Sequence, residues 1–243
     1  MDLSIIIPAL NESKKIERDL LAAASFLEDQ RMEGEILVVD DGSTDDTTTV
    51  VQRIQKQRQL PVRAMRYELH RGKGFAVRSG IAGSRGNFVL FIDSGMTIPL
   101  HFITSGLELL KQDFCEIAHA SRKLPESEIR QPHKLSRKIT SWAFQKTIKY
   151  WLNLPRNLTD TQCGFKIYPG EIGRELYSEC QTDGFLFDLE IIIRAQKKGY
   201  RIQEFPIQWT ADPDSRLSLR KAPQEILKEI YQIRKITFDS CKQ

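Results

Sequence analysis

The chain has 243 residues, of which 40% are hydrophobic and 28% are charged, as expected for a globular protein with a substantial core. Its net charge of +4 is too small to imply nucleic-acid binding by itself. The four scattered cysteines form neither a CxxC zinc pair nor a disulfide framework, which indicates reduced thiols in a cytoplasmic protein. No apolar run reaches the length of a membrane-spanning helix, and a strand pattern begins almost at once, so we expect no leader peptide.

The first half of the chain alternates short apolar runs with helical patterns. Strands are predicted over LSIIIPA from Leu3, EILVVD (35–40), PVRAMRY (61–67) and NFVLFID (87–93). Helices are predicted over 12–27, from near Asp45, and over 73–82. Apolar strands alternating with helices predict an α/β fold with a mainly parallel central sheet covered on both faces. Polar clusters follow the first, second and fourth strands, where such sheets place their ligand sites.

The second half begins with a basic stretch. Residues 129–159 mix basic and apolar side chains and contain no acidic residue. This pattern is typical of a solvated basic helix pair, but also of an interfacial helix whose basic residues face anionic headgroups. A helix followed by a strand is predicted within GFLFDLEIIIRAQKKGYRIQEFPIQW (184–209), and a charged amphipathic helix from about Pro223.

Three motifs carry chemistry. In VVDDGSTDDT (38–47) a strand–turn–helix junction explains the glycine and the capping residues, but not the adjacent carboxylates of Asp40 and Asp41, which suit the N–H and hydroxyl edges of a nucleoside. In IIPALNE, Pro8 marks the exit of the strand, and the helix dipole alone explains Glu12. In HRGKGFAVRSG two glycines flank Lys73 at a helix start, which favours an anion site although the Walker pattern is absent.

These stretches and FIDSG, in this order, resemble the inverting family 2 glycosyltransferases of the GT-A fold. HASRKL, DTQCGFKIY, GFLFDLEII and PDSRL resemble the branch that contains dolichyl-phosphate glucosyltransferases and other polyprenyl-phosphate glycosyltransferases. The resemblance extends to about Leu219. It implies a GT-A domain over residues 1–220, which includes the basic segment 129–159, and a C-terminal helical extension over 221–243.

The resemblance also implies roles for single residues. The nucleotide sugar would lie along Pro8, Ala9, Glu12, Asp41, Lys73 and Asp93. The expected catalytic residues are Asp93, Asp160 and Arg122. Asp93 would hold Mg²⁺ or Mn²⁺ on the diphosphate, and Asp160 would lie near the reacting sugar carbon.

The acceptor's phosphate would meet a second set of residues. Arg122 would offer it a planar fork, and Lys166, Ser215 and Arg216 would add positive charge and a hydroxyl. Ser215 and Arg216 lie in a loop that, in relatives, closes over the donor.

One position departs from the family pattern. Relatives generally carry Asp-x-Asp where this chain reads Asp93-Ser94-Gly95. Because magnesium is often held by one or two carboxylates with phosphates and waters, Asp93 alone can suffice. Loss of catalysis with nucleotide binding retained is the other interpretation.

The resemblance therefore implies a hexosyltransferase that moves a hexose from a nucleotide sugar to a polyprenyl or dolichyl phosphate. DTQCGFK favours glucose and UDP-glucose, because it resembles the glucosyltransferase branch, but the sequence alone fixes neither the donor base nor the sugar. We expect a cytoplasmic protein that contacts a membrane surface peripherally and binds no nucleic acid. A family 2 enzyme with a non-lipid acceptor and a catalytically impaired nucleotide-sugar-binding protein are the alternatives. Oligomeric state stays open.

Overall fold

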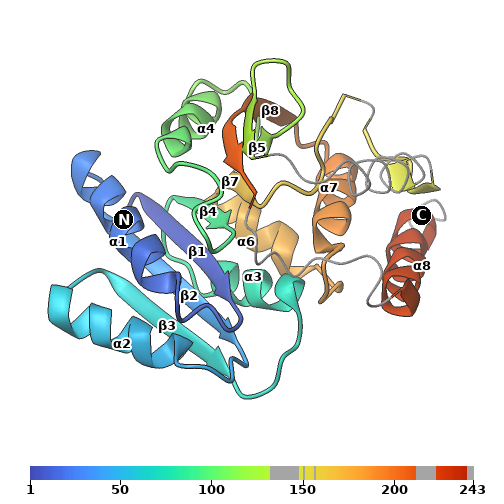
Figure 1. Cartoon of the computed structure of the whole chain (residues 1–243). Helices are drawn as coiled ribbons and strands as arrows, with labels where there is room; N and C mark the ends of the chain where they lie inside the picture. Colours follow the sequence, from blue (N-terminus) through green and yellow to red (C-terminus); the bar gives the residue numbers. More distant parts are fainter. Residues whose placement is uncertain (132–147, 150, 156, 212–222, 240–243) are drawn as a thin grey trace.

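The computed structural model describes residues 1–131, 148–149, 151–155, 157–211 and 223–239 (Figure 1). Its main sheet has seven strands in the order β3-β2-β1-β4-β7-β5-β8. Their bounds are Leu3–Ala9 (β1), Gly34–Asp41 (β2), Val62–Tyr67 (β3), Phe88–Ile92 (β4), Ile117–Ser121 (β5), Phe165–Pro169 (β7) and Ile202–Pro206 (β8). All neighbours pair in parallel except β7, which is antiparallel to β4 and β5. The predicted mainly parallel α/β sheet is confirmed.

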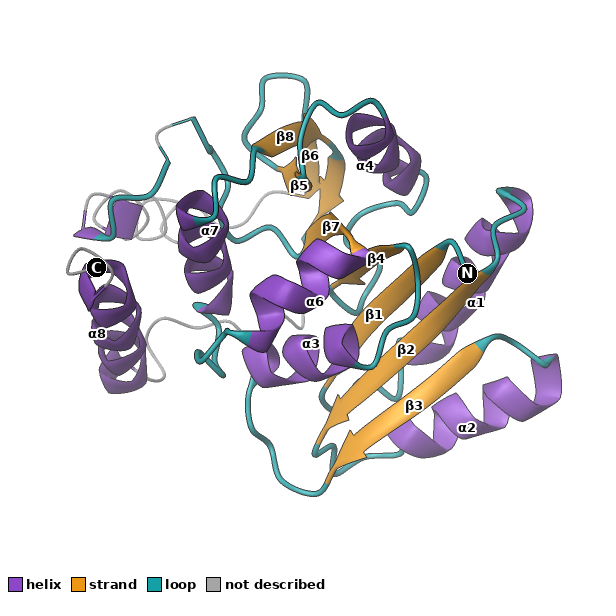
Figure 2. Ribbon diagram, turned by 180° about the vertical axis from the view of Figure 1, so that it is seen from behind, coloured by secondary structure: helices purple, strands orange, loops and turns teal. Residues whose placement is uncertain are grey.

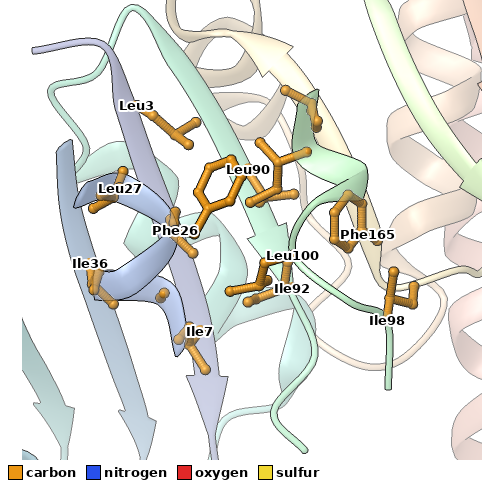
Figure 3. Packing of buried hydrophobic residues seen from close by; sticks show 14 of the residues in the cluster. Leu3, Ile7, Phe26, Leu27, Ile36, Leu90, Ile92, Ile98, Leu100 and Phe165 are labelled. Carbon is orange, nitrogen blue, oxygen red and sulfur yellow. The ribbon is translucent and has the colours of Figure 1, made fainter. Parts of the chain in front are cut away.

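Helices cover both faces of this sheet (Figures 1 and 2). One face carries α1 (Ile16–Asp29), α2 (Thr47–Arg58) and α4 (Phe102–Lys111), and the other carries α3 (Lys73–Ala82), α6 (Gly170–Ser178) and α7 (Phe187–Lys197). On the first face Phe26 and Leu27 of α1 pack against strand residues such as Leu3 and Leu90 (Figure 3). Burial of both faces explains why the strands read as continuous apolar runs.

The predicted elements are found with small shifts. The first helix begins at Ile16 instead of Glu12, because residues 12–15 form a turn in which the N–H groups of Lys15 and Ile16 both donate to the Glu12 carbonyl at 2.9 Å. Pro8 stays inside β1, which pairs with β2 as far as Ala9. The pairing with β4 ends at Ile6, so β1 leaves that neighbour before the proline.

The C-terminal helix α8 (Pro223–Asp239) packs on its own chain. Its Ile230 and Ile233 are buried with residues of α7 and of the stretch around Leu152. None of the described helices has the length and apolarity needed to cross a membrane. The division at residue 220 stays a prediction.

Most of the basic segment lies outside the described residues. Its first residues belong to β6 (Glu128–Gln131), which pairs in parallel with β9 (Gln208–Thr210) in a small second sheet. Near its end Leu152 is buried, whereas Trp151 is half exposed under the guanidinium of Arg234. The choice between a solvated helix pair and an interfacial helix therefore stays open for residues 132–147.

Candidate active site

The sheet topology gathers polar residues from both halves of the chain at one edge. The parallel strands β1, β2, β4 and β5 end there, and the antiparallel β7 begins there. Asp93 follows β4 directly, Arg122 follows β5, and the loop 159–164 leads into β7. DTQCGF and FIDSG are thereby brought together although some seventy residues separate them in the sequence.

Asp93 lies at the centre of this edge. Its N–H donates to the Gly164 carbonyl at 3.1 Å, and its Oδ1 lies 2.5 Å from Nζ of Lys73, the first residue of α3. Burial disfavours the charged ammonium, but the attraction of Asp93, together with that of Asp188, raises the pKa of Lys73. Asp93 and Lys73 thus form a charged pair, and the Asp93 side chain is 37% exposed.

Gly164 makes room for this carboxylate. A Cβ atom at Gly164 would lie 2.1 Å from Oδ2 of Asp93, far inside van der Waals contact. Only glycine at position 164 of DTQCGF therefore lets the Asp93 carboxylate pack this closely against the loop.

Asp41 holds the loop that precedes Lys73. Its carboxylate accepts hydrogen bonds from the N–H groups of Arg71 and Gly72, both at 2.8 Å, and lies 2.7 Å from Nδ1 of His70. The side chain is buried, so the structure favours a loop-positioning role over the predicted contact with base or ribose, which stays a prediction.

Asp40 has protein partners too. Its carboxylate accepts from the Ser43 N–H at 2.8 Å and from the Thr48 hydroxyl. A strand–turn–helix junction alone offers no structural reason for the adjacent carboxylates Asp40 and Asp41. In the structure both accept hydrogen bonds that position loops.

Arg122 and Asp160 form a two-point ion pair. Nε of Arg122 lies 2.6 Å from Oδ2 of Asp160, and Nη2 lies 2.8 Å from Oδ1. Asp160 is completely buried; burial alone would raise the pKa of its carboxyl group, but Arg122 holds it well below its usual range. Such a carboxylate is a weak base and is remote from a substrate in the solvent.

Arg122 itself remains accessible. Its side chain is 27% exposed and its guanidinium carbon lies 5.5 Å from the ring of Trp209 in β9. Asp160 occupies Nε and Nη2 of the planar fork that was predicted to bind a phosphate. Asp160 acts here as a positioning residue for Arg122.

Glu204 of β8 fixes the loop that carries Asp160. Its carboxylate accepts from the N–H groups of Thr159 at 2.7 Å and of Asp160 at 2.6 Å. Ser121, at the end of β5, adds a hydroxyl contact of 2.7 Å to Thr159. The last strand of the sheet thus sets the position of the Asp160–Arg122 pair.

Lys166, predicted to meet the acceptor's phosphate, is buried between β7 and α7. It is 1% exposed, and its ammonium donates to the carboxylate of Asp188 in α7 and, at 3.0 Å, to the Thr161 carbonyl. Burial raises the pKa of Asp188, opposed by Lys166 and Lys73. Because the ammonium of Lys166 is buried and bonded to Asp188 and Thr161, its direct contact with an acceptor phosphate is not favoured. Through the Thr161 carbonyl, Lys166 instead holds the loop 159–164.

The first two polar loops are tied to each other. The Glu12 N–H donates to the Thr47 hydroxyl at 2.8 Å and the Asn11 N–H to the Ser43 hydroxyl at 2.8 Å. Ala9 is buried and Pro8 partly buried at the same edge. Nucleotide contact by Pro8, Ala9 and Glu12 stays a prediction, and Ser215 and Arg216 lie outside the described residues.

Sequence reasoning missed several positioning residues. Asp188 and Gly164 stand within motifs that carry the family resemblance, so a signal was present for them. Glu204, whose partners Thr159 and Asp160 lie more than forty residues earlier in the chain, had none. Among the described residues no group of three or more His, Cys, Asp or Glu side chains is arranged to hold a metal ion.

Comparison with known proteins agrees with this arrangement. Residues 4–176 match the family described as glycosyl transferase family 2. Over 96% of the chain and 74% of the relative, the sequence is 31% identical to a protein of Saccharomyces cerevisiae named dolichyl-phosphate beta-glucosyltransferase. Over 88% and 69%, it is 32% identical to the protein of that name from Homo sapiens.

A solved structure shares the fold. Glucosyl-3-phosphoglycerate synthase from Mycobacterium tuberculosis, in complex with Mn²⁺, UDP and glucosyl-3-phosphoglycerate, superposes with a TM-score of 0.69 at 18% identity, over 97% of this chain and 79% of that one.

Proposed function

Since the chain belongs to glycosyl transferase family 2, we propose that it transfers glucose from UDP-glucose to a polyprenyl phosphate of the dolichyl-phosphate type. The relatives named dolichyl-phosphate beta-glucosyltransferase, which align over 88–96% of the chain, support this acceptor and sugar. The observation that carries the proposal is the meeting of Lys73, Asp93 and Arg122 at one sheet edge, because these charges suit a sugar diphosphate.

The electrostatics of the edge suit phosphate chemistry. Negative charge develops on the leaving UDP, so stabilising it is the main demand on the site. Lys73 and Arg122 supply positive charge there. Burial disfavours the charged form of Arg122, but Asp160 above all, with a smaller contribution from Asp93, raises its pKa. A divalent ion, when bound, would neutralise the diphosphate. Asp93, 37% exposed, would hold it, since Mg²⁺ or Mn²⁺ bound chiefly through phosphates and waters needs only one or two carboxylates.

The acceptor needs no strong base. A lipid monophosphate is already anionic near neutral pH, since its second pKa is about 6. Asp160 is accordingly not needed as a strong base: its carboxylate is paired with Arg122 and its pKa is lowered. The phosphate oxygen attacks the anomeric carbon as the bond to UDP breaks, and a single displacement inverts that carbon.

A peripheral position at the cytoplasmic face of a membrane would bring the enzyme to this lipid. The outer face of α8 supports it. Leu227 is 62% exposed and Tyr231 72% exposed, and Lys228 and Lys235 are exposed beside them. Exposed apolar and aromatic residues next to lysines suit an anionic interface.

Transfer assays test the reaction. Purified protein is incubated with UDP-glucose or GDP-mannose and a short polyprenyl phosphate, with and without Mg²⁺ or Mn²⁺. We expect metal-dependent formation of the β-linked glucosyl lipid from UDP-glucose, lost in Lys73→Met. UDP binding with neither transfer nor hydrolysis would instead identify a binding protein.

Vesicle co-sedimentation tests the membrane contact separately. Binding to vesicles that contain anionic lipid should fall in Leu227→Ser/Tyr231→Ser. Phe114→Ser, which removes an equally exposed side chain beyond the end of α4, is the matched control and should bind like the native protein. Equal binding by the double variant would contradict the assignment of α8.

A further inference from the structure

The Asp93–Gly95 turn, which has Gly95 where the family motif has its second carboxylate, is held by a carboxylate of helix α1. Asp19 lies in the first turn of α1, and its Oδ2 accepts hydrogen bonds from the Ser94 hydroxyl at 2.9 Å and from the Gly95 N–H at 2.7 Å. Ser94 and Gly95 follow Asp93 directly.

The burial of Asp19 calls for an explanation. Its side chain is 2% exposed, and its neighbours on the same face of α1, Ile16, Leu20 and Ala23, are buried apolar residues. The helix dipole favours an acidic residue in a first turn, but it does not require a buried one. A buried carboxylate is costly unless it is hydrogen-bonded. Here Oδ2 is bonded to the two groups of the turn, and Oδ1 lies 3.4 Å from Nη2 of the exposed Arg18 side chain.

The turn is unusual in its backbone. Gly95 has φ +104° and Met96 has φ +51°, so two consecutive residues stand in the left-handed half of conformational space. On either side the chain is fixed by the core, where Ile92 precedes the turn and Ile98 and Leu100 follow it (Figure 3). Asp19 contacts the middle, so the turn is held at three points.

Asp93 receives its position from this turn and from two further contacts. Gly164 accepts from its N–H and Lys73 pairs with its carboxylate. Those contacts act at Asp93 itself, whereas Asp19 acts on the two residues after it. Removing Asp19 would free the turn while leaving the Lys73 pair possible.

We infer that Asp19 is a positioning residue for the donor-diphosphate site: it fixes the Asp93–Gly95 turn from α1 and so orients the single carboxylate of Asp93. The inference rests on the proposed function for the identity of the ligand. Asp19 is too buried to reach the donor, and its effect passes through the turn.

Two variants separate position from charge. Asp19→Ala removes the acceptor, whereas Asp19→Asn keeps one oxygen that can accept both hydrogen bonds but removes the charge. Dissociation constants for UDP in the presence of Mn²⁺ are measured by calorimetry, together with kcat and KM for UDP-glucose. We expect about tenfold weaker binding for Asp19→Ala, since hydrogen bonds to a charged group are among the stronger ones, and a change within about twofold for Asp19→Asn.

Glu35 provides a matched control. It is a buried carboxylate that accepts from the Ser4 hydroxyl and the Arg85 N–H, both at 2.8 Å, at the opposite edge of the sheet. Glu35→Ala should lower the unfolding temperature, as Asp19→Ala does, yet leave UDP binding unchanged.

Three results would overturn the inference: native-like binding by Asp19→Ala, an equal loss in Asp19→Asn, or an equal loss in Glu35→Ala. If the native protein bound no UDP, this inference and the proposed function would both fail. Binding without transfer would remove only the catalytic proposal.

Discussion

Restoring the missing carboxylate by Gly95→Asp is the sharpest test of how this site is built. From the sequence alone, the substitution should raise metal-dependent activity if the site is impaired but otherwise intact. The conformation leads to another expectation. At φ +104° a residue with a Cβ atom is strained, at a cost of about 1–3 kcal/mol. The new carboxylate would also stand beside Asp19, whose Oδ2 lies 2.7 Å from the Gly95 nitrogen, and like charges repel.

The strain converts into a measurable shift. In a domain of this size 1 kcal/mol lowers the unfolding temperature by about 2–4 °C, so we expect a fall of about 2–12 °C. Gly95→Ala carries the same backbone strain without the charge and is the control. Gly95→Asp should be no more stable than Gly95→Ala and should bind UDP in the presence of Mn²⁺ no more tightly than the native protein. Tighter binding together with native stability would show that the turn rearranges freely, and the reasoning from φ would be refuted.

Three further predictions concern the same edge. Gly164→Ala places a Cβ atom 2.1 Å from Oδ2 of Asp93. The carboxylate must move, and kcat/KM should fall about 10²-fold, as it does for displacements of about 1 Å. Gly83→Ala is the control: the nearest atom there is the sulfur of the flexible Met65 side chain at 3.3 Å, so kcat/KM should be unchanged. Asp160→Asn should lower the free energy of unfolding, measured by urea titration, by about 2–3 kcal/mol. This is less than the loss expected for a fully buried ion pair, because Arg122 is partly exposed. A loss below about 0.5 kcal/mol would contradict the role given to this pair. Because the pKa of Asp160 is lowered in the folded state, its stabilisation is present above the unfolded carboxyl pKa of about 3.9 and is lost as the pH falls below it; the difference in stability between the native protein and Asp160→Asn should therefore be constant from pH 5 to 8 and shrink in stronger acid.

Local patterns predicted most of the first half of the fold. The helix predicted over 73–82 has those bounds in the structure, because Gly72 and Gly83 flank an uninterrupted helical pattern. The four predicted strands begin and end within one or two residues of their observed bounds, because turn residues on both sides limit where each apolar run can start and stop. Asp93 directly follows the fourth predicted strand, as expected, and Arg122 follows β5, a strand that was not predicted; the roles of both residues stay proposals.

Long-range contacts decided the rest. Nothing near Asp160 in the sequence shows that Arg122 will occupy its carboxylate, or that Glu204 will hold its backbone from β8. Lys166 reads as an available cation, yet its side chain is buried between β7, which runs antiparallel to β4, and α7, where it pairs with Asp188. The direction of a strand depends on its neighbours, which the sequence pattern does not reveal.

The position of β7 between β4 and β5 also has a consequence for the order of assembly during synthesis. β5 is complete at Ser121, more than forty residues before β7 begins at Phe165, so a growing chain holds both neighbours before the strand that separates them. The free edge of β4 is exposed during that interval, and an unpaired edge invites wrong partners. Closure of the central sheet must await a late and non-local pairing, which is slow to form. Gly164 and Asp160 arrive with that strand, whereas Glu204, which holds the backbone of Asp160, arrives only with β8.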